Sequence, residues 1–75
     1  MNFKHSDAYR KMGLNVAYFR KDKGFTQEAL AEKIGADRTT IGKIETAVSG
    51  VSLDMLFAIA DALEITPREL LEFRD

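Results

Sequence analysis

Residues 25–46 read FTQEALAEKIGADRTTIGKIET, and they carry the most informative pattern in the chain. Within it, two short segments, 27–34 and 38–46, carry apolar residues at the spacing of an α-helix. Gly35 opens the turn between them, because a glycine there allows a positive φ without a Cβ clash. Two short helices joined by such a turn cross at a steep angle. The stretch therefore predicts a helix-turn-helix at about residues 27–46.

Three further helices are predicted outside this motif. Apolar residues recur at helical spacing over residues 8–23, where Ser6 is expected to cap the helix. Ser52 is expected to cap the next helix after the motif. Residues 66–69, TPRE, form a capping box with proline at the first helical position, and the last helix is expected to reach about Phe73.

Five helices and no strand give an all-α fold, a compact five-helix bundle in which residues 1–75 form a single domain. In the helix after Ser52, the spacing of the apolar residues predicts which side chains point into the core. These are Leu53, Leu56, Ile59, Ala60 and Leu63.

The composition excludes several classes of function. Hydrophobic residues make up 45% of the chain and charged residues 31%, a balance that argues against disorder. The absence of cysteine excludes disulfides and cysteine-based zinc sites, and the single His5 has no second ligand nearby, so no metal or cofactor is expected. No apolar run approaches the roughly 20 residues of a membrane span, so a cytoplasmic protein with no membrane contact is expected.

Charge is distributed unevenly along the chain, although the net charge is only −1. Residues 1–50 contain nine Lys and Arg against six Asp and Glu, whereas residues 51–75 contain two against six. Attraction to nucleic-acid phosphates requires a positive surface. The basic part of the chain is the part that contains the predicted helix-turn-helix.

The second helix of the motif is expected to supply the contacts to DNA bases. A helix can enter the major groove, which is about 12 Å wide, and present its exposed side chains to base edges. Ile41 and Ile44 are expected to turn inward, which leaves the polar residues of this helix exposed. An arginine can bind guanine O6 and N7, a threonine can contact a base or a thymine methyl, and a lysine can reach guanine. The candidate base contacts are Arg38, Thr39, Thr40 and Lys43.

These motifs resemble the Cro and phage-repressor type of helix-turn-helix, the XRE family. The resemblance rests on residues 25–35, FTQEALAEKIG, on Asp37 to Ile41, and on Ile44-Glu45. It continues through 52–63 to Leu70-Leu71 and covers about residues 13–71. The triplet Asp37-Arg38-Thr39 is also similar to the controller proteins of restriction-modification systems.

The resemblance implies a fold, a set of contacts and an ion pair. It implies a lambda-repressor-like bundle of five helices, a DNA-backbone contact at Gln27, and base contacts at Arg38, Thr39 and Lys43. It also implies a semi-buried structural ion pair between Arg20 and Glu45. The expected partners are double-stranded DNA, bound at a pseudo-palindromic operator to regulate or repress transcription, and a second copy of the chain.

The chain departs from the family after Glu45. Family members usually continue with a glycine and then basic residues, whereas this chain continues TAVSG at residues 46–50. Ala47 lacks the freedom of glycine to end a helix in the left-handed conformation, so the preceding helix is expected to end differently or to run longer. Phosphate contacts are expected at Thr26, Gln27, Thr46 and Ser49, all without charge.

A protein-interaction module of the same fold, an antitoxin or an anti-regulator, is the alternative function. An enzyme is not expected, because no serine or threonine has a histidine base and no glycine-rich phosphate loop is present. A dimer is expected because the short last helix has more apolar side chains than one face can bury. The expected dimer interface is Leu70, Leu71 and Phe73, and no small-molecule effector is expected.

Overall fold

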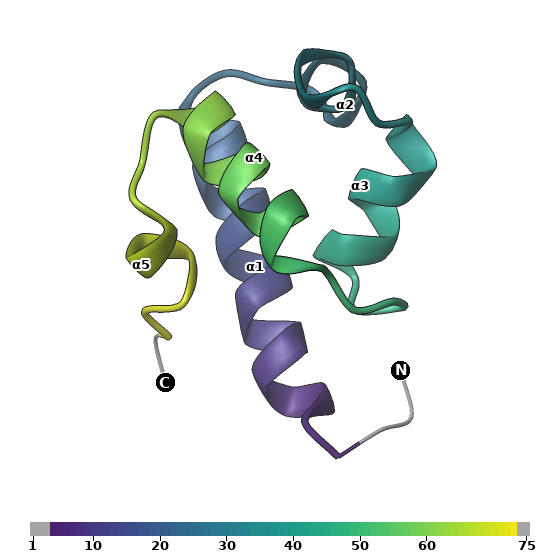
Figure 1. The fold of residues 1–75 in the computed structure, drawn as a ribbon, viewed down its shortest axis with the longest axis vertical. Coiled ribbons are helices and arrows are strands. Elements are labelled where there is room, and N and C mark those ends of the chain that lie inside the picture. Colours follow the sequence, from purple (N-terminus) through teal and green to yellow (C-terminus); the bar gives the residue numbers. More distant parts are fainter. Residues whose placement is uncertain (1–3, 74–75) are drawn as a thin grey trace.

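Helix α1 (Ser6–Asp22) is the longest element and lies roughly along the longest axis of the molecule (Figure 1). The structure is a computed structural model that describes residues 4–73, and in this range it contains five α-helices and no strand. The five-helix, all-α prediction is confirmed. After α1 come α2 (Gln27–Ile34), α3 (Arg38–Glu45), α4 (Leu53–Leu63) and α5 (Pro67–Leu70).

Side-chain caps start four of the five helices. The side-chain oxygens of Thr26, Asp37, Ser52 and Thr66 each accept a hydrogen bond from the backbone N–H three residues further on. Such a cap satisfies one of the amide groups that the first turn leaves without a partner. Helix α1 differs, because its N-cap position is His5 and no side chain caps it. The prediction that Ser6 caps this helix is wrong, since Ser6 is already within it.

Helix α3 ends in the left-handed conformation in spite of its alanine. Ala47 has φ of 59°, its N–H donates to the Ile44 oxygen at 3.2 Å, and the Val48 N–H donates to the Lys43 oxygen at 2.9 Å. These two bonds close the helix in the way that a glycine usually allows. The prediction that this helix would end differently or run longer is therefore wrong. The left-handed conformation of Ala47 costs about 1–2 kcal/mol, which these hydrogen bonds and the burial of its side chain offset.

The core draws on all five helices. Its fully or nearly fully buried residues come from α1 (Met12, Val16), α2 (Leu30, Ala31), α3 (Ile41, Ile44), α4 (Leu56, Ile59, Ala60, Ala62, Leu63) and α5 (Leu70). Leu53 was expected among them but is 66% exposed, because nothing in the described chain covers that side of the first turn of α4. Leu70 was expected in a dimer interface, and this is also wrong, because it has no exposed surface.

Helix α5 is shorter than its sequence predicts. It ends at Leu70, and Phe73 lies outside it, partly buried against the core. At this end the buried Asn15 on α1 binds the backbone, since its Nδ2 donates to the backbone oxygens of Leu70 at 3.0 Å and of Glu72 at 3.1 Å. These bonds satisfy two carbonyl groups that have no partner within α5 and hold the segment after it against α1.

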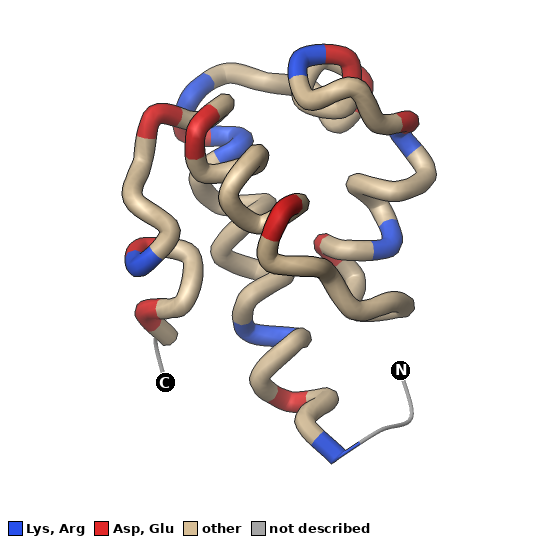
Figure 2. The backbone as a smooth tube through the Cα atoms, in the orientation of Figure 1, with Lys and Arg blue, Asp and Glu red and all other residues tan. Residues whose placement is uncertain are grey.

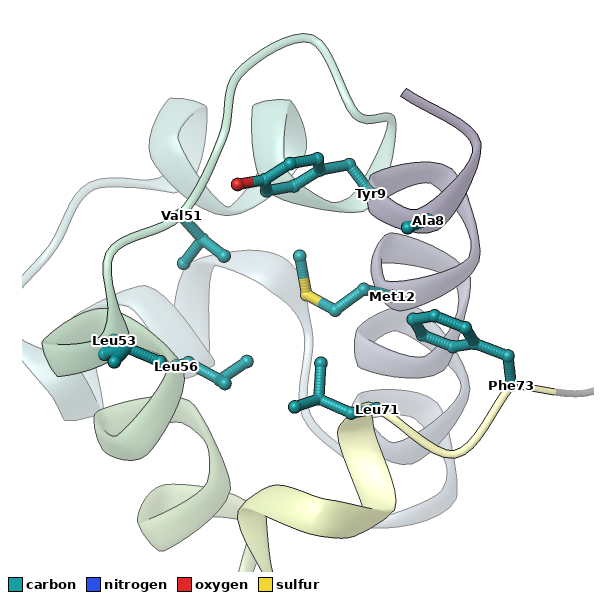
Figure 3. A pocket seen from close by; sticks show the side chains of 8 residues that line it. All are labelled: Ala8, Tyr9, Met12, Val51, Leu53, Leu56, Leu71 and Phe73. Carbon is teal, nitrogen blue, oxygen red and sulfur yellow. The ribbon is translucent and has the colours of Figure 1, made fainter. Parts of the chain in front are cut away.

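An apolar hollow of about 190 Å³ opens between α1, α4 and the segment after α5. Figure 3 shows Tyr9 and Met12 facing Leu56 and Leu71 across this space. Its lining is Ala8, Tyr9, Met12, Val51, Leu53, Leu56, Leu71 and Phe73, and we call it the apolar hollow. No helix of residues 4–73 is long and apolar enough to cross a membrane.

Candidate nucleic-acid interface

Helices α2 and α3 form a helix-turn-helix. Gly35 has φ of 74°, and the Ala36 N–H donates to the Ala31 oxygen at 2.9 Å, which closes α2 and reverses the chain. Asp37 then caps α3, because its Oδ1 accepts from the Thr40 N–H at 2.8 Å. The short turn thus sets the direction in which α3 starts.

Helix α3 has a buried face and an outward face. Ile41 and Ile44, at 0% and 2% exposure, anchor one side in the core. The exposed residues of the other side define what we call the outward face of α3, namely Arg38, Thr39, Lys43 and Thr46, the last at the C-cap. Gly42 is half-buried beside them, and a Cβ built there would meet only Gln27 Oε1, at 3.9 Å.

Two threonine hydroxyls of this region already donate their protons within the chain. Thr40 Oγ1 donates to Asp37 Oδ1 at 3.0 Å, and Thr46 Oγ1 donates to the Gly42 oxygen at 2.8 Å. Thr40 is also half-buried. DNA phosphates only accept hydrogen bonds, so in this arrangement Thr46 offers a phosphate no hydroxyl proton, and Thr40 offers a base only its methyl group and lone pairs.

A buried cluster of polar side chains fixes α3 to its neighbours. Arg20 Nε donates to Glu45 Oε2 at 2.6 Å, and Arg20 Nη2 donates to Glu45 Oε1 at 3.2 Å. Gln27 Nε2 donates to the same Glu45 Oε1 at 2.9 Å, and Arg20 Nη1 donates to the Phe25 oxygen at 2.8 Å. The side chains of the ion pair are only 9% and 6% exposed. One carboxylate therefore ties α1, α2 and α3 together.

This cluster changes the expectation for Gln27. The carboxamide lies at the start of α2 but turns toward α3 and is half-buried. Only the second Nε2 proton is left to donate to a phosphate, because the first goes to Glu45. Thr26 is exposed and accepts from the Ala29 N–H at 3.0 Å, and Ser49 is half-buried after α3.

Gly13 is a structural residue of this interface that sequence reasoning missed. A Cβ at Gly13 would lie 2.5 Å from the Ile44 oxygen and 2.7 Å from the Glu45 oxygen. The absence of a side chain therefore lets α1 touch the last turn of α3. The sequence did offer a sign of this contact, because a glycine inside a predicted helix costs about 1 kcal/mol relative to alanine and so calls for a structural reason.

Helices α3 and α4 differ in the sign of their exposed charges (Figure 2). Helix α3 carries Arg38 and Lys43 on its outward face, whereas the charged residues of α4 are Asp54 and Asp61. Hydrogen bonds from the Thr40 backbone and side chain lower the pKa of Asp37, so this carboxylate stays ionised beside Arg38. In residues 4–73 no group of three or more potential ligands is placed to hold a metal ion.

A helix-turn-helix with an anchored second helix defines a class of DNA-binding proteins. A model of the helix-turn-helix family HTH_3 matches residues 16–70, and the chain belongs to this family. Members of this class are DNA-binding transcription regulators. The match begins within α1 and ends at the last residue of α5.

Solved structures agree with this assignment. The chain is 38% identical to the restriction-modification controller protein C.AhdI from Aeromonas hydrophila, with a TM-score of 0.86 over 91% of this chain and 99% of that one. It is 27% identical to SinR, a master regulator for biofilm formation solved in complex with DNA, with a TM-score of 0.77 over 81% of this chain and 98% of that one.

A hypothetical transcription factor of Neisseria meningitidis serogroup B is 33% identical over 60 residues. This match covers 80% of the chain and 57% of the relative's length. The chain therefore spans little more than half of that relative.

Proposed function

We propose that the chain is a transcription regulator that recognises a specific double-stranded DNA sequence by inserting α3 into the major groove. The observation that carries this proposal is the outward face of α3. Arg38, Thr39 and Lys43 are exposed, and within residues 4–73 their side chains form no hydrogen bond or ion pair. An α-helix with its side chains is about 10–12 Å across, which suits a groove about 12 Å wide.

Arg38 is the main base-reading residue in this proposal. It is the first residue of α3, and the N-terminal part of a recognition helix is the part that contacts base edges. Its guanidinium matches guanine O6 and N7 with two parallel hydrogen bonds. Thr39 and Lys43, one turn apart, read neighbouring positions.

Phosphate contacts flank the groove at both ends of the motif. The start of α2 presents Thr26, the remaining N–H of Gln27 and unpaired backbone amides. Beyond α3, Ser49 and the backbone offer neutral donors, while Thr46 contributes only after giving up its bond to Gly42. Binding is then weaker and less sensitive to salt than it would be with lysines in the segment after α3.

The regulator acts as a homodimer in this proposal. A two-fold axis places two recognition helices about 34 Å apart, one helical turn of DNA, on a pseudo-palindromic operator. Leu71 is half-exposed at the mouth of the apolar hollow, and Phe73 lines it. These two residues, without the buried Leu70, are the proposed interface.

A protein-interaction module is the second candidate. Leu53 and Phe57 on α4 are 66% and 49% exposed, one turn apart, and acidic residues flank them. Such a patch suits a protein partner. In that case, the chain would bind its partner but would not distinguish an operator from other DNA.

Binding titrations on an operator selected from random DNA test the proposal. Arg38→Ala is expected to weaken operator binding by about 1–3 kcal/mol per half-site, because a bidentate base contact is lost. Binding to random DNA is expected to change much less. The matched control is Arg68→Ala, which removes an exposed arginine from α5. Equal losses on operator and random DNA would make Arg38 a phosphate contact instead.

A further inference from the structure

The segment that follows α3 lacks the cations expected at the edge of a DNA-binding surface. Residues 46–52 contain no Lys or Arg. The Thr46 hydroxyl proton is also engaged with the Gly42 oxygen at 2.8 Å. If α3 enters the major groove, this end of the helix comes close to a phosphodiester backbone. A cation for that backbone must therefore come from another element.

Helix α1 places Arg10 beside the C-terminal end of α3. Gly13, one turn further along α1, touches the last carbonyl groups of α3. Beyond this contact, a surface hollow of about 270 Å³ is lined by Ser6, Asp7, Arg10, Thr46 and Ala47. Thr46 belongs to the outward face of α3, so Arg10 lies at the C-terminal edge of that face.

The charge of Arg10 is only partly compensated. Its Nη2 donates to Asp7 Oδ1 at 2.9 Å, while Asp7 Oδ2 lies 3.5 Å from Lys11 Nζ. The single carboxylate of Asp7 is thus shared between two cations. The Arg10 and Asp7 side chains are 57% and 70% exposed. Exposed pairs of this kind are weak, so the guanidinium is free to turn toward a stronger anion.

We propose that Arg10 is a DNA-phosphate contact, which supplies from α1 the positive charge that the segment after α3 lacks. The ligand is a phosphodiester oxygen of the DNA backbone at the edge of the groove that α3 enters. A guanidinium binds two phosphate oxygens with parallel hydrogen bonds, which suits this contact. The inference rests on the proposed DNA-binding function.

The salt dependence of binding tests this contact directly. Each phosphate neutralised by the protein adds about 0.9 to the slope of log K against log salt concentration. Arg10→Gln removes the charge at an exposed helical position with little change in helix propensity. We expect this variant to lower the slope by about 0.9 per bound protomer and to bind random duplex DNA several-fold more weakly at low salt.

Two control variants separate a contact from a general charge effect. Arg10→Lys retains the charge and is expected to keep the slope of the unmodified protein. Arg68→Gln removes one positive charge from α5, which lies across the molecule from α3 (Figure 1), and is also expected to keep that slope. Thermal melts of all three variants check that each remains folded.

The outcomes distinguish this inference from the function on which it rests. DNA binding by the unmodified protein with an unchanged slope for folded Arg10→Gln would overturn the Arg10 contact alone. A loss of slope in Arg68→Gln equal to that in Arg10→Gln would also overturn it, because net charge would then explain both. No salt-dependent DNA binding by the unmodified protein would overturn the proposed function and the contact together.

Discussion

Single residues on α1 fix the position of α3. Gly13 lets the backbone of α3 approach, and Arg20 holds the carboxylate of Glu45. Neither residue belongs to the outward face of α3, yet both position it. Substitutions at these positions are therefore expected to alter DNA binding through the placement of α3.

Gly13→Ala is expected to destabilise the protein by about 1–3 kcal/mol, although alanine is the better helix former. The new Cβ would lie 2.5 Å from the Ile44 oxygen, so α3 must shift away from α1. Denaturant unfolding and DNA titrations measure both consequences. The matched control is Gly42→Ala, which meets no close atom and is expected to raise stability by about 1 kcal/mol. A Gly13→Ala protein as stable as Gly42→Ala would contradict the close contact.

Arg20→Met is expected to lower stability by about 3–5 kcal/mol, because it leaves the buried Glu45 carboxylate with Gln27 as its remaining side-chain donor. Operator affinity is expected to fall as well, since α3 loses its link to α1. Thermal melts and titrations on the same samples test this. Replacing both partners, Arg20→Met with Glu45→Met, is expected to recover part of the stability. A change below about 0.5 kcal/mol in the single variant would show that the pair is unimportant.

Among the helices, α3 is expected to be sensitive to acid because its N-cap is the carboxylate of Asp37. Hydrogen bonds from the Thr40 backbone and side chain lower the pKa of Asp37 below its usual 3.8. A carboxyl whose pKa is lower in the folded state stabilises the fold above its unfolded pKa. That contribution disappears as the pH falls through the folded pKa. Asp7 has the same direction of shift, from its hydrogen bond with Arg10 and the charge of Lys11.

Asp37→Asn is expected to retain the cap but to remove its dependence on pH, because asparagine caps helices as well as aspartate does. Melting temperatures measured from about pH 6 to about pH 2.5 are expected to fall less steeply for the variant than for the unmodified protein. Asp7 remains in both proteins, so some acid sensitivity persists in the variant. Parallel melting curves over the whole range would exclude Asp37 as a source of acid sensitivity.

In the molecule as a whole, the exposed charges of α3 and α4 differ in sign. The exposed cations of α3 lie on its outward face, while both charged residues of α4 are acidic, and Asp54 follows Leu53, which lines the apolar hollow. A two-fold axis near the hollow would keep the acidic surface away from phosphate. This arrangement supports an interface at Leu71 and Phe73.

Leu71→Asp is expected to convert a homodimer into a monomer with its helices intact, because Leu71 is half-exposed in the single chain. Light scattering at micromolar protein concentration and circular dichroism measure the two properties. Leu70→Asp provides a contrast and is expected to unfold the chain, since Leu70 is fully buried. An unmodified protein that stays monomeric and binds a palindromic operator without cooperativity would rule out the proposed dimer.

Patterns within the sequence predicted the five helices, the caps at Ser52 and Thr66 and the helix-turn-helix. These features depend on contacts within a few residues, such as Asp37 with Thr40 or Thr66 with Glu69, and local spacing encodes them. The family resemblance also implied the pairing of Arg20 with Glu45, which the structure contains.

For several other residues, packing between helices sets whether the side chain is exposed or buried. The burial of Leu70, the end of α5 at the Asn15 hydrogen bonds and the approach of Gly13 to α3 depend on residues far apart in the chain. The position of Arg10 beside Thr46 has the same origin. Such contacts are set by how helices pack, and periodicity within one helix carries no information about its neighbour's backbone.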